Sequence, residues 1–432
     1  MKILEYGQPG FAQKLKRACP SFRAADEIAE TVRTVIADVE REGDKAVFRY
    51  TEKFDKAKLT ARTLRVKADE LSAAPKTLTT AQRKAIKEAI HCVKDFHRKT
   101  MPQSWHAKNP HGATVGEAFF PIQRVGLYVP GGQVPLVSTV IMSAVLAKLA
   151  GCPEVAVCTP PGKDGSVSPS LLAALHLCGV EEVYKIGGVQ ALAALAIGTK
   201  TVPAVDKVFG PGNAYVMEAK RALFGRVGVD LLPGPSEVLI IGDSTSNPAF
   251  IAADLLAQAE HGTGKEKVFL IVESREQAAA IQAEITAQAE TLSHRDAALG
   301  VLKHHGFCVI ASDLEAIAEI ANYIAPEHLE LQVKPDSRKI LAKKITTAGA
   351  MLIGGETPTV LGDFTAGPSH TLPTDRTGRF FGGMQVTDYM RRTSIVEYDA
   401  KSIALAWPVV RAFAEMEQLD AHGRSLEMRL EK

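Results

Sequence analysis

The chain has 432 residues, of which 46% are hydrophobic and 23% are charged. These proportions are typical of globular proteins, and the length exceeds what one ordinary core organises, so we expect two or more domains. The 51 basic and 49 acidic residues are interspersed and leave a net charge of +2, which argues against nucleic acid as a main partner.

The N-terminal segment has no apolar region of the kind found in secretory signals, and no run of roughly 18 uncharged apolar residues occurs that would suit a membrane span. We therefore expect a cytoplasmic protein. Six cysteines occur without a C-x-x-C pair. Five of them have apolar or helical surroundings, which are typical of buried free thiols in a reducing compartment, so we assign no cysteine to a metal or to catalysis.

Charged amphipathic helices are predicted first, over 26–50 and 81–98. From Arg124 a strand, a Gly- or Pro-containing turn and a helix follow one another three times. The predicted strands of this series are 125–129, 155–159 and 183–186. Their spacing is typical of βαβ units in a parallel, doubly wound sheet.

A second α/β series begins at Val238. Its predicted strands are 238–241, 268–272, 307–310, 329–333 and 351–353. Its predicted helices are 249–260, 276–288 and 314–324. A Gly-rich region then runs to Gly383, and the chain is helical again from Ser402.

Polar side chains occur near the ends of several predicted strands. In open parallel sheets, ligands bind beyond the carboxyl ends of the strands. At that edge we expect Tyr128, Gln190, Ser236, Glu327 and His328. Asn213 follows a Gly-Pro-Gly turn at a helix start, where backbone N–H groups can face a phosphate. Taken alone, each such turn is better explained as a plain strand-to-helix connection, and no G-x-G-x-x-G motif, P-loop, H-E-x-x-H or G-x-S-x-G motif occurs.

Two further groups of residues suggest chemistry. Gln258 and His261 share one face at a helix end, and with Asp363 and another histidine they offer ligands suited to Zn²⁺ or Mn²⁺. The adjacent Glu327 and His328 could act as general acid and base. A solvated helix end and turn-forming residues are the competing interpretations, and spacing alone does not decide between them.

Seven long motifs occur in order along essentially the whole chain. They are GLYVPGG at Gly126–Gly132, GGVQALAALAIGT at Gly187–Thr199, GPGNAYVMEAK at Gly210–Lys220, the run Val229–His261, APEHLELQ at Ala325–Gln332, GDFTAGPSHTLPT at Gly362–Thr374 and LDAH at Leu419–His422. Together they resemble the histidinol dehydrogenase family. Two positions depart from its usual pattern: Pro233 stands where the family usually has Ala, and Ser369 where it often has Asn.

The resemblance implies an α/β fold with two incomplete Rossmann-like domains, parallel sheets, and small helical N- and C-terminal segments used in dimerisation. It implies a dimerisation segment at 1–24 and a C-terminal helical dimerisation tail at 381–432. A first α/β domain, made of 25–127 with 236–380, would carry the metal and catalytic residues. A second, 128–235, would bind NAD.

The resemblance also implies roles for individual residues. One Zn²⁺ per subunit would be held by Gln258, His261, Asp363 and His422, the last from the other subunit of a homodimer. The acid/base pair would be Glu327 and His328. Substrate would contact Ser236, Gln258, His261, His328, Asp363, His370, Glu417 and His422. NAD would contact Tyr128, Gln190 and Asn213.

The implied activity is the NAD-linked, four-electron oxidation of L-histidinol through L-histidinaldehyde to L-histidine, the last steps of histidine biosynthesis. His328 would accept the hydroxyl proton in each oxidation, and Glu327 would activate water after the first. The nearest competing function is the same chemistry on another amino alcohol or a sulfonated diol. A zinc hydrolase and a non-catalytic scaffold compete as well, and formation of NADH separates a dehydrogenase from both.

Overall fold

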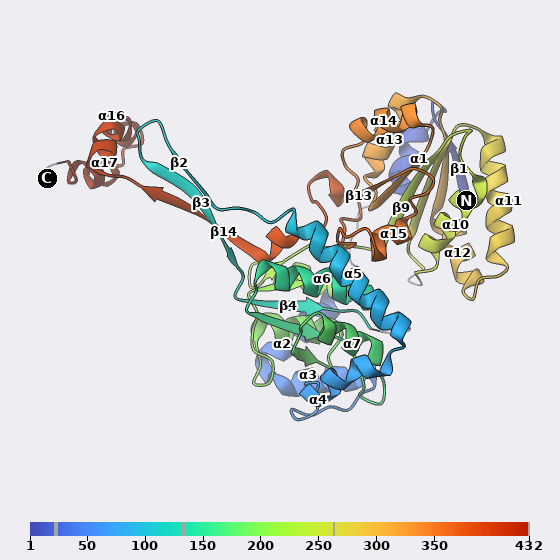
Figure 1. Ribbon diagram of the computed structural model, residues 1–432, viewed down its shortest axis with the longest axis horizontal. Coiled ribbons are helices and arrows are strands. Elements are labelled where there is room, and N and C mark those ends of the chain that lie inside the picture. The colour runs from blue at the N-terminus through green and yellow to red at the C-terminus, as the bar shows by residue number, and fades with distance from the viewer. Residues whose placement is uncertain (21–24, 132–134, 262–263, 431–432) are drawn as a thin grey trace.

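The computed structural model describes residues 1–20, 25–131, 135–261 and 264–430, and within them the strands form three sheets (Figure 1). Two are parallel sheets, and each forms the centre of a lobe. We call these the five-stranded lobe and the six-stranded lobe. The third is antiparallel and lies in an arm that projects away from both lobes. The expected mixed α/β fold with parallel sheets is confirmed.

The five-stranded lobe has the strand order β6-β5-β4-β7-β8, and all its neighbouring strands are parallel. Its strands are β4 (Arg124–Tyr128), β5 (Glu154–Cys158), β6 (Glu182–Tyr184), β7 (Lys207–Phe209) and β8 (Gly228–Val229). Its connecting helices are α6 (Val137–Ala150), α7 (Pro169–Leu177), α8 (Gly188–Ile197) and α9 (Ala214–Leu223). The strand order reverses between β4 and β7, which is where ligands of such sheets usually bind.

The six-stranded lobe has the strand order β1-β11-β10-β9-β12-β13 and is also parallel. Its strands are β1 (Lys2–Glu5), β9 (Glu237–Gly242), β10 (Lys267–Val272), β11 (Gly306–Ile310), β12 (His328–Gln332) and β13 (Ala350–Ile353). Its helices are α1 (Phe11–Ala18), α10 (Pro248–Ala259), α11 (Arg275–Ala289), α12 (Arg295–His305), α13 (Leu314–Ile324), α14 (Pro335–Lys344) and α15 (Thr359–Phe364). Alternate residues of β9 enter different cores: Val238 and Ile240 pack with α10 to α12, and Leu239 and Ile241 with α1, α13 and α14.

The N-terminal helices pack differently from the grouping expected from the sequence. These helices are α2 (Asp26–Glu42), α3 (Asp44–Asp55), α4 (Ala68–Ala73) and α5 (Thr80–Arg98). Val32 of α2 shares a core with Leu192 of α8, and Ile90 of α5 shares one with Leu146 of α6. Residues 25–98 therefore cover the five-stranded sheet rather than joining 236–380. The segment expected at 1–24 for dimerisation contributes β1, which pairs with β11 at the edge of the six-stranded sheet.

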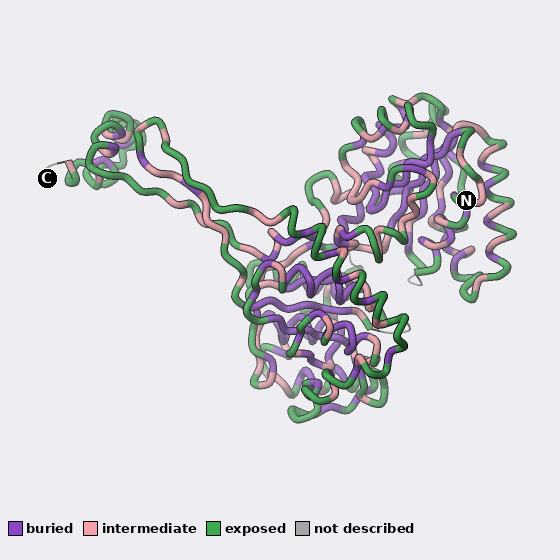
Figure 2. The backbone as a smooth tube through the Cα atoms, in the orientation of Figure 1, coloured by how far each residue is buried: buried purple, intermediate pink, exposed green. Residues whose placement is uncertain are grey.

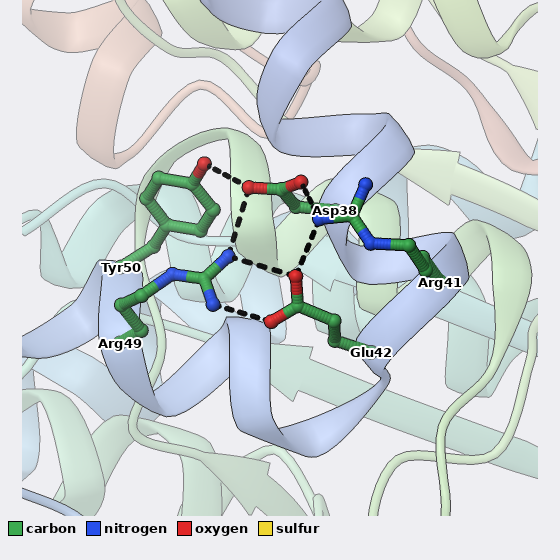
Figure 3. Close-up of polar contacts among 5 residues, drawn as sticks. All are labelled: Asp38, Arg41, Glu42, Arg49 and Tyr50. Carbon is green, nitrogen blue, oxygen red and sulfur yellow. Dashed lines mark hydrogen bonds and ion pairs between the residues drawn. The ribbon is translucent and has the colours of Figure 1, made fainter.

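The predicted helix over 26–50 is broken in two at Gly43, whose φ of 58° is a conformation that favours glycine. Charged side chains connect the two helices at this corner (Figure 3). Arg49 bridges Asp38, at 2.8 Å, and Glu42, and the Tyr50 hydroxyl donates to Asp38 at 2.6 Å. Exposed ion pairs stabilise a fold little, so the glycine rather than the charge network sets the corner.

The arm consists of β2 (Trp105–Lys108), β3 (Thr114–Pro121) and β14 (Met390–Glu397), followed by α16 (Ala400–Met416) and α17 (Asp420–Glu427). Short 3₁₀ helices occur elsewhere at Ala74–Thr77, Thr377–Arg379 and Val386–Tyr389. The C-terminal segment expected to be helical from 381 thus contains a 3₁₀ turn and the strand β14 before its two helices. Buried segments concentrate in the lobes, whereas the arm is largely exposed (Figure 2). Along α16 the apolar side chains of Leu405, Val409, Phe413 and Met416 are all exposed.

The structure also bears on the expectations for the cysteines and for membrane-spanning helices. All six cysteines are free thiols, and all except Cys92 are buried, so the predicted buried thiols are confirmed. No helix in the described parts of the chain is long and apolar enough to cross a membrane.

Candidate functional site

Ser236 and Glu327 directly precede the neighbouring strands β9 and β12, which pair in register with His328 opposite Val238. These residues therefore lie at the amino ends of their strands, and the expectation of the carboxyl ends was wrong for Ser236, Glu327 and His328. The reason is that the strand after Pro326 begins at His328 itself, so the polar pair introduces the strand instead of following it.

The backbone of Glu237 contacts both members of the predicted acid/base pair. Its N–H donates to Glu327 Oε2 at 2.8 Å, and its carbonyl oxygen lies 3.3 Å from His328 Nδ1. Because a carbonyl oxygen only accepts, the ring proton belongs on Nδ1, and Nε2 is left with a free lone pair. His328 Nδ1 and Glu327 Oε2 are 3.6 Å apart. The pair is thus held so that His328 can act as a base through Nε2.

Burial shifts the protonation of both groups toward their neutral forms. It raises the pKa of Glu327 well above its usual range, although the N–H of Glu237 opposes the shift. It lowers the pKa of His328 to about 4, against the opposing effects of the Asp363 charge and the Glu237 contact. At neutral pH His328 is therefore an uncharged imidazole, the form that accepts a proton.

A buried ion cluster that the sequence did not reveal fixes the loop before β9. Lys267 Nζ pairs with Glu237 Oε1 at 2.8 Å and also with Asp375. Thr374 accepts a hydrogen bond from the Gly234 N–H, and the Asp375 N–H donates to Glu237 Oε1 at 3.2 Å. Since Lys267 and Asp375 are 108 positions apart, local sequence patterns gave no signal of this contact.

Gln258 and His261 lie together at the end of α10. His261 Nδ1 is 3.0 Å from the backbone oxygen of Gln258 and 3.2 Å from its side-chain nitrogen. The carbonyl oxygen can only accept and the amide nitrogen can only donate, so the two contacts favour opposite tautomers of His261. Both contacts hold the imidazole beside Gln258 at the end of α10, where the two predicted ligands lie together.

Asp363, on α15, belongs to the same electrostatic cluster. Its Oδ1 lies 3.5 Å from His370 Nδ1. Burial alone would raise the pKa of Asp363, but the hydrogen bond to His370 and the charges of His370, His328 and His261 lower it below its usual value. An ionised carboxylate beside an imidazole and an amide is a donor set that fits zinc.

Two predicted site residues lie elsewhere. Glu417 ends α16 and His422 lies in α17, both exposed at the far end of the arm and away from α10 and α15 (Figure 1). Over the residues described, no three His, Cys, Asp or Glu side chains are grouped so that they could hold a metal. Of the four predicted zinc ligands, the six-stranded lobe holds His261, Asp363 and the amide of Gln258, whereas the arm holds His422.

The predicted cofactor residues flank the point where the strand order of the five-stranded sheet reverses. Tyr128 ends β4, and its hydroxyl accepts a hydrogen bond from the Gly188 N–H at 3.1 Å. Burial raises the pKa of Tyr128 to about 12, only partly opposed by that bond. Asn213 follows β7 and caps α9, accepting from the backbone N–H groups of Tyr215 and Val216. A helix start next to a strand crossover is suited to a phosphate.

Gln190, on α8, is fully buried, yet neither its Oε1 nor its Nε2 has a hydrogen-bond partner among the described residues. Nearly all buried polar groups are hydrogen-bonded, because an unpaired one is unfavourable. A buried amide with both groups unsatisfied is therefore a candidate contact for a ligand, and its helix begins beside Tyr128.

The segment that carries Asp363 and His370 also contacts the five-stranded lobe. Gly367 adopts φ 102°, and a Cβ at this position would lie 2.7 Å from the backbone oxygen of Cys92 in α5. The Ser369 hydroxyl lies 3.5 Å from the backbone oxygen of Met142 in α6. The segment between Asp363 and His370 thus packs closely against the five-stranded lobe.

Replacing Gly367 by Ala is expected to destabilise the protein by about 2 kcal/mol, because the side chain meets backbone atoms and the conformation disfavours an L-residue. Urea unfolding measures the loss. Gly382→Ala is the matched control, since a Cβ there meets nothing within 4 Å. Equal stability of the two variants would show that the loop moves freely.

Comparisons with known proteins identify the family to which the chain is similar. The chain matches the family model of histidinol dehydrogenase over residues 21–430. It is 39% identical over 434 residues to the histidinol dehydrogenase of Gluconobacter oxydans, covering 100% of both chains. It is 42% identical over 428 residues to that of Rhodopseudomonas palustris, covering 99% of this chain and 98% of the other. The crystal structure of histidinol dehydrogenase from Elizabethkingia anophelis has a TM-score of 0.94 and 34% identity, over 100% of this chain and 98% of that one.

Proposed function

Because the chain belongs to the histidinol dehydrogenase family, we propose that this oxidoreductase converts L-histidinol through L-histidinaldehyde to L-histidine, with zinc and two molecules of NAD⁺. One observation carries the proposal: Glu237 fixes Glu327 and His328 side by side and leaves His328 Nε2 free. The charges of Asp363 and His261 act on the same imidazole, so the base and the metal donors lie in one site.

The residues of this chain would divide the first oxidation between them. His328 Nε2 accepts the hydroxyl proton as hydride leaves the substrate carbon. Gln258, His261 and Asp363 would hold zinc, which when bound orients the substrate and stabilises negative charge on its oxygen. Ser236, which directly precedes β9, and His370, whose Nδ1 lies 3.5 Å from Asp363 Oδ1, would position the substrate.

The second oxidation needs water to add to the bound aldehyde. Glu327, in its ionised form, takes a proton from that water and so favours the hydrate. His328 then accepts the hydroxyl proton of the hydrate as the second hydride leaves, which yields the carboxylate. The buried position of Glu327 keeps bulk water from competing with this step.

NAD⁺ is proposed to bind at the strand crossover of the five-stranded lobe and to accept the two hydrides. The support is the unsatisfied amide of Gln190 together with Tyr128 and Asn213 on either side of the crossover. No Gly-rich dinucleotide fingerprint is required for this arrangement, because side chains and the start of α9 provide the polar groups.

A homodimer with shared active sites completes the proposal. In this proposal the lobe supplies three of the four zinc ligands, and His422 and Glu417 lie on the arm, far from their own lobe. The exposed apolar side chains of Leu405, Val409 and Phe413 give α16 a surface that a second copy can cover. His422 of that copy would complete the zinc site, and its Glu417 would pair with a positively charged substrate nitrogen.

The first test is the number of NADH molecules formed per L-histidinol at limiting substrate. We expect two with zinc present, and none after a chelator has removed the metal. One NADH would mean that the reaction ends at the aldehyde. No NADH from folded protein would contradict the proposal and direct the search to another amino alcohol or a sulfonated diol.

A further inference from the structure

One face of β12 is polar although the strand is buried. Its alternate residues His328, Glu330 and Gln332 point one way, whereas Leu329 and Leu331 enter the core that contains α13 and α14. Glu330 is opposite Ile240 of β9, which packs with α10. The polar face of β12 is therefore directed toward α10, and Glu330 is fully buried there.

Hydrogen bonds from this face reach two other elements. The side-chain amide of Gln332 donates to Asp254 Oδ2 on α10 at 2.8 Å and to Glu330 Oε2 at 2.9 Å. Glu330 Oε1 accepts from both the backbone N–H and the hydroxyl of Thr359, at 2.9 and 2.7 Å, where α15 begins. One group of side chains, buried at Glu330 and Gln332 and half-buried at Asp254 and Thr359, thus connects α10, β12 and α15.

Two of the connected residues lie in the same helices as proposed metal donors, each one helical turn before the donor. Asp254 is one helical turn before Gln258 on α10, and Thr359 is one turn before Asp363 on α15. Residues four apart lie on the same face of a helix. A displacement of either anchored turn would therefore move a metal donor with it.

The two carboxyl groups are close enough to affect each other's protonation. Burial, and then the charge of Glu330 and a hydrogen bond with it, raise the pKa of Asp254 to about 8. At neutral pH the pair therefore retains a proton, which a buried carboxyl pair needs if it is to hold together. In this singly protonated state the interaction between Asp254 and Glu330 is attractive rather than repulsive, so it can hold α10 and α15 together.

We propose that Glu330 and Asp254 are positioning residues, which set α15 relative to α10 so that Asp363 meets Gln258 and His261 in the geometry that a metal ion requires. The inference rests on the proposed zinc site. Neither residue is assigned contact with substrate, and their effect passes through Thr359 and Gln332.

The test is zinc affinity of the full-length protein, measured by competition with a chromogenic chelator. Glu330→Ala is expected to weaken zinc binding by about 10- to 100-fold, the range found when residues supporting metal ligands are removed. Glu330→Gln is expected to restore affinity to within about threefold of the wild type, since its amide oxygen can still accept from Thr359. Rescue by an isosteric residue separates positioning from bulk charge.

The control is Asp313→Ala, which removes a hydrogen bond to the Ala316 N–H at the start of α13 in the same lobe. It is expected to reduce thermal stability without changing zinc affinity. If Glu330→Ala does not fold, Thr359→Val decides instead, with a smaller loss of affinity expected.

The positioning role and the proposed metal site would be contradicted by different results. Zinc affinity unchanged in Glu330→Ala, or reduced equally in Glu330→Gln, would reject the positioning role while leaving the zinc site in place. Wild-type protein that binds no zinc would reject the proposed metal site, and the inference with it.

Discussion

Glu327→Gln is expected to slow the oxidation of L-histidinaldehyde by a factor of about 10² to 10⁴, the usual contribution of a general base, and to slow the oxidation of L-histidinol much less. Only the second oxidation requires water to be activated. The amide oxygen of the variant can still accept from the Glu237 N–H, so His328 should keep its place and its role as base in the first oxidation.

The same variant should change the pH dependence. Burial raises the pKa of Glu327 well above its usual range, so the carboxylate that acts as base forms only as the pH rises, and the aldehyde step is lost as the pH falls through that value. The pKa of His328, lowered to about 4 by burial, keeps this base neutral well below pH 7. The wild type should therefore show a pH-dependent limb in the aldehyde step that the variant lacks.

Separate rate measurements with L-histidinol and with L-histidinaldehyde test both statements. L-Histidinaldehyde should accumulate, and be trapped by an amine reagent, when the variant is given L-histidinol. An equal loss of rate in the two oxidations would contradict the water-activating role of Glu327, whether or not the substitution also affects folding.

Much of this arrangement follows from short segments of sequence. Most strands of both parallel sheets were predictable because buried strands are runs of apolar residues that end at Gly or Pro, whereas the short strands β1, β7 and β8 were not predicted. Glu327 with His328, and Gln258 with His261, were found because each pair lies within one turn or one helix end. In these cases the residues that determine the geometry are neighbours in the chain.

Other features depend on contacts between residues that are far apart in the chain, and a local sequence pattern does not identify such contacts. The apolar face of α2 shows that the helix is buried, but not that it packs on α8 rather than on the six-stranded sheet. The strand β14 was missed because most of its residues are exposed, so no alternation of apolar and polar residues marks it. The link from Glu330 to Thr359 spans 29 residues between two separate elements, and neither residue is unusual in its own segment.

The second large expected effect is on enzyme activity, and it follows from the position of His422 on the arm. His422→Ala and Gln258→Ala are each expected to abolish most activity, because each removes one of the four proposed zinc ligands. If the site is shared, a mixture of the two variants should regain activity after subunit exchange. Each mixed dimer then contains one site with all its ligands and one site that lacks two.

Random exchange of equal amounts makes about half of the dimers mixed, so about one quarter of all sites should be intact, and NADH formation should approach that fraction of the wild-type rate. A mixture of Gln258→Ala with Asp363→Ala is the matched control. Both of these residues lie in the same lobe, so no combination of subunits yields an intact site and no recovery is expected. Recovery in this control, or none in the first mixture after exchange has been verified by mass spectrometry, would contradict a zinc site completed by the arm of a second copy.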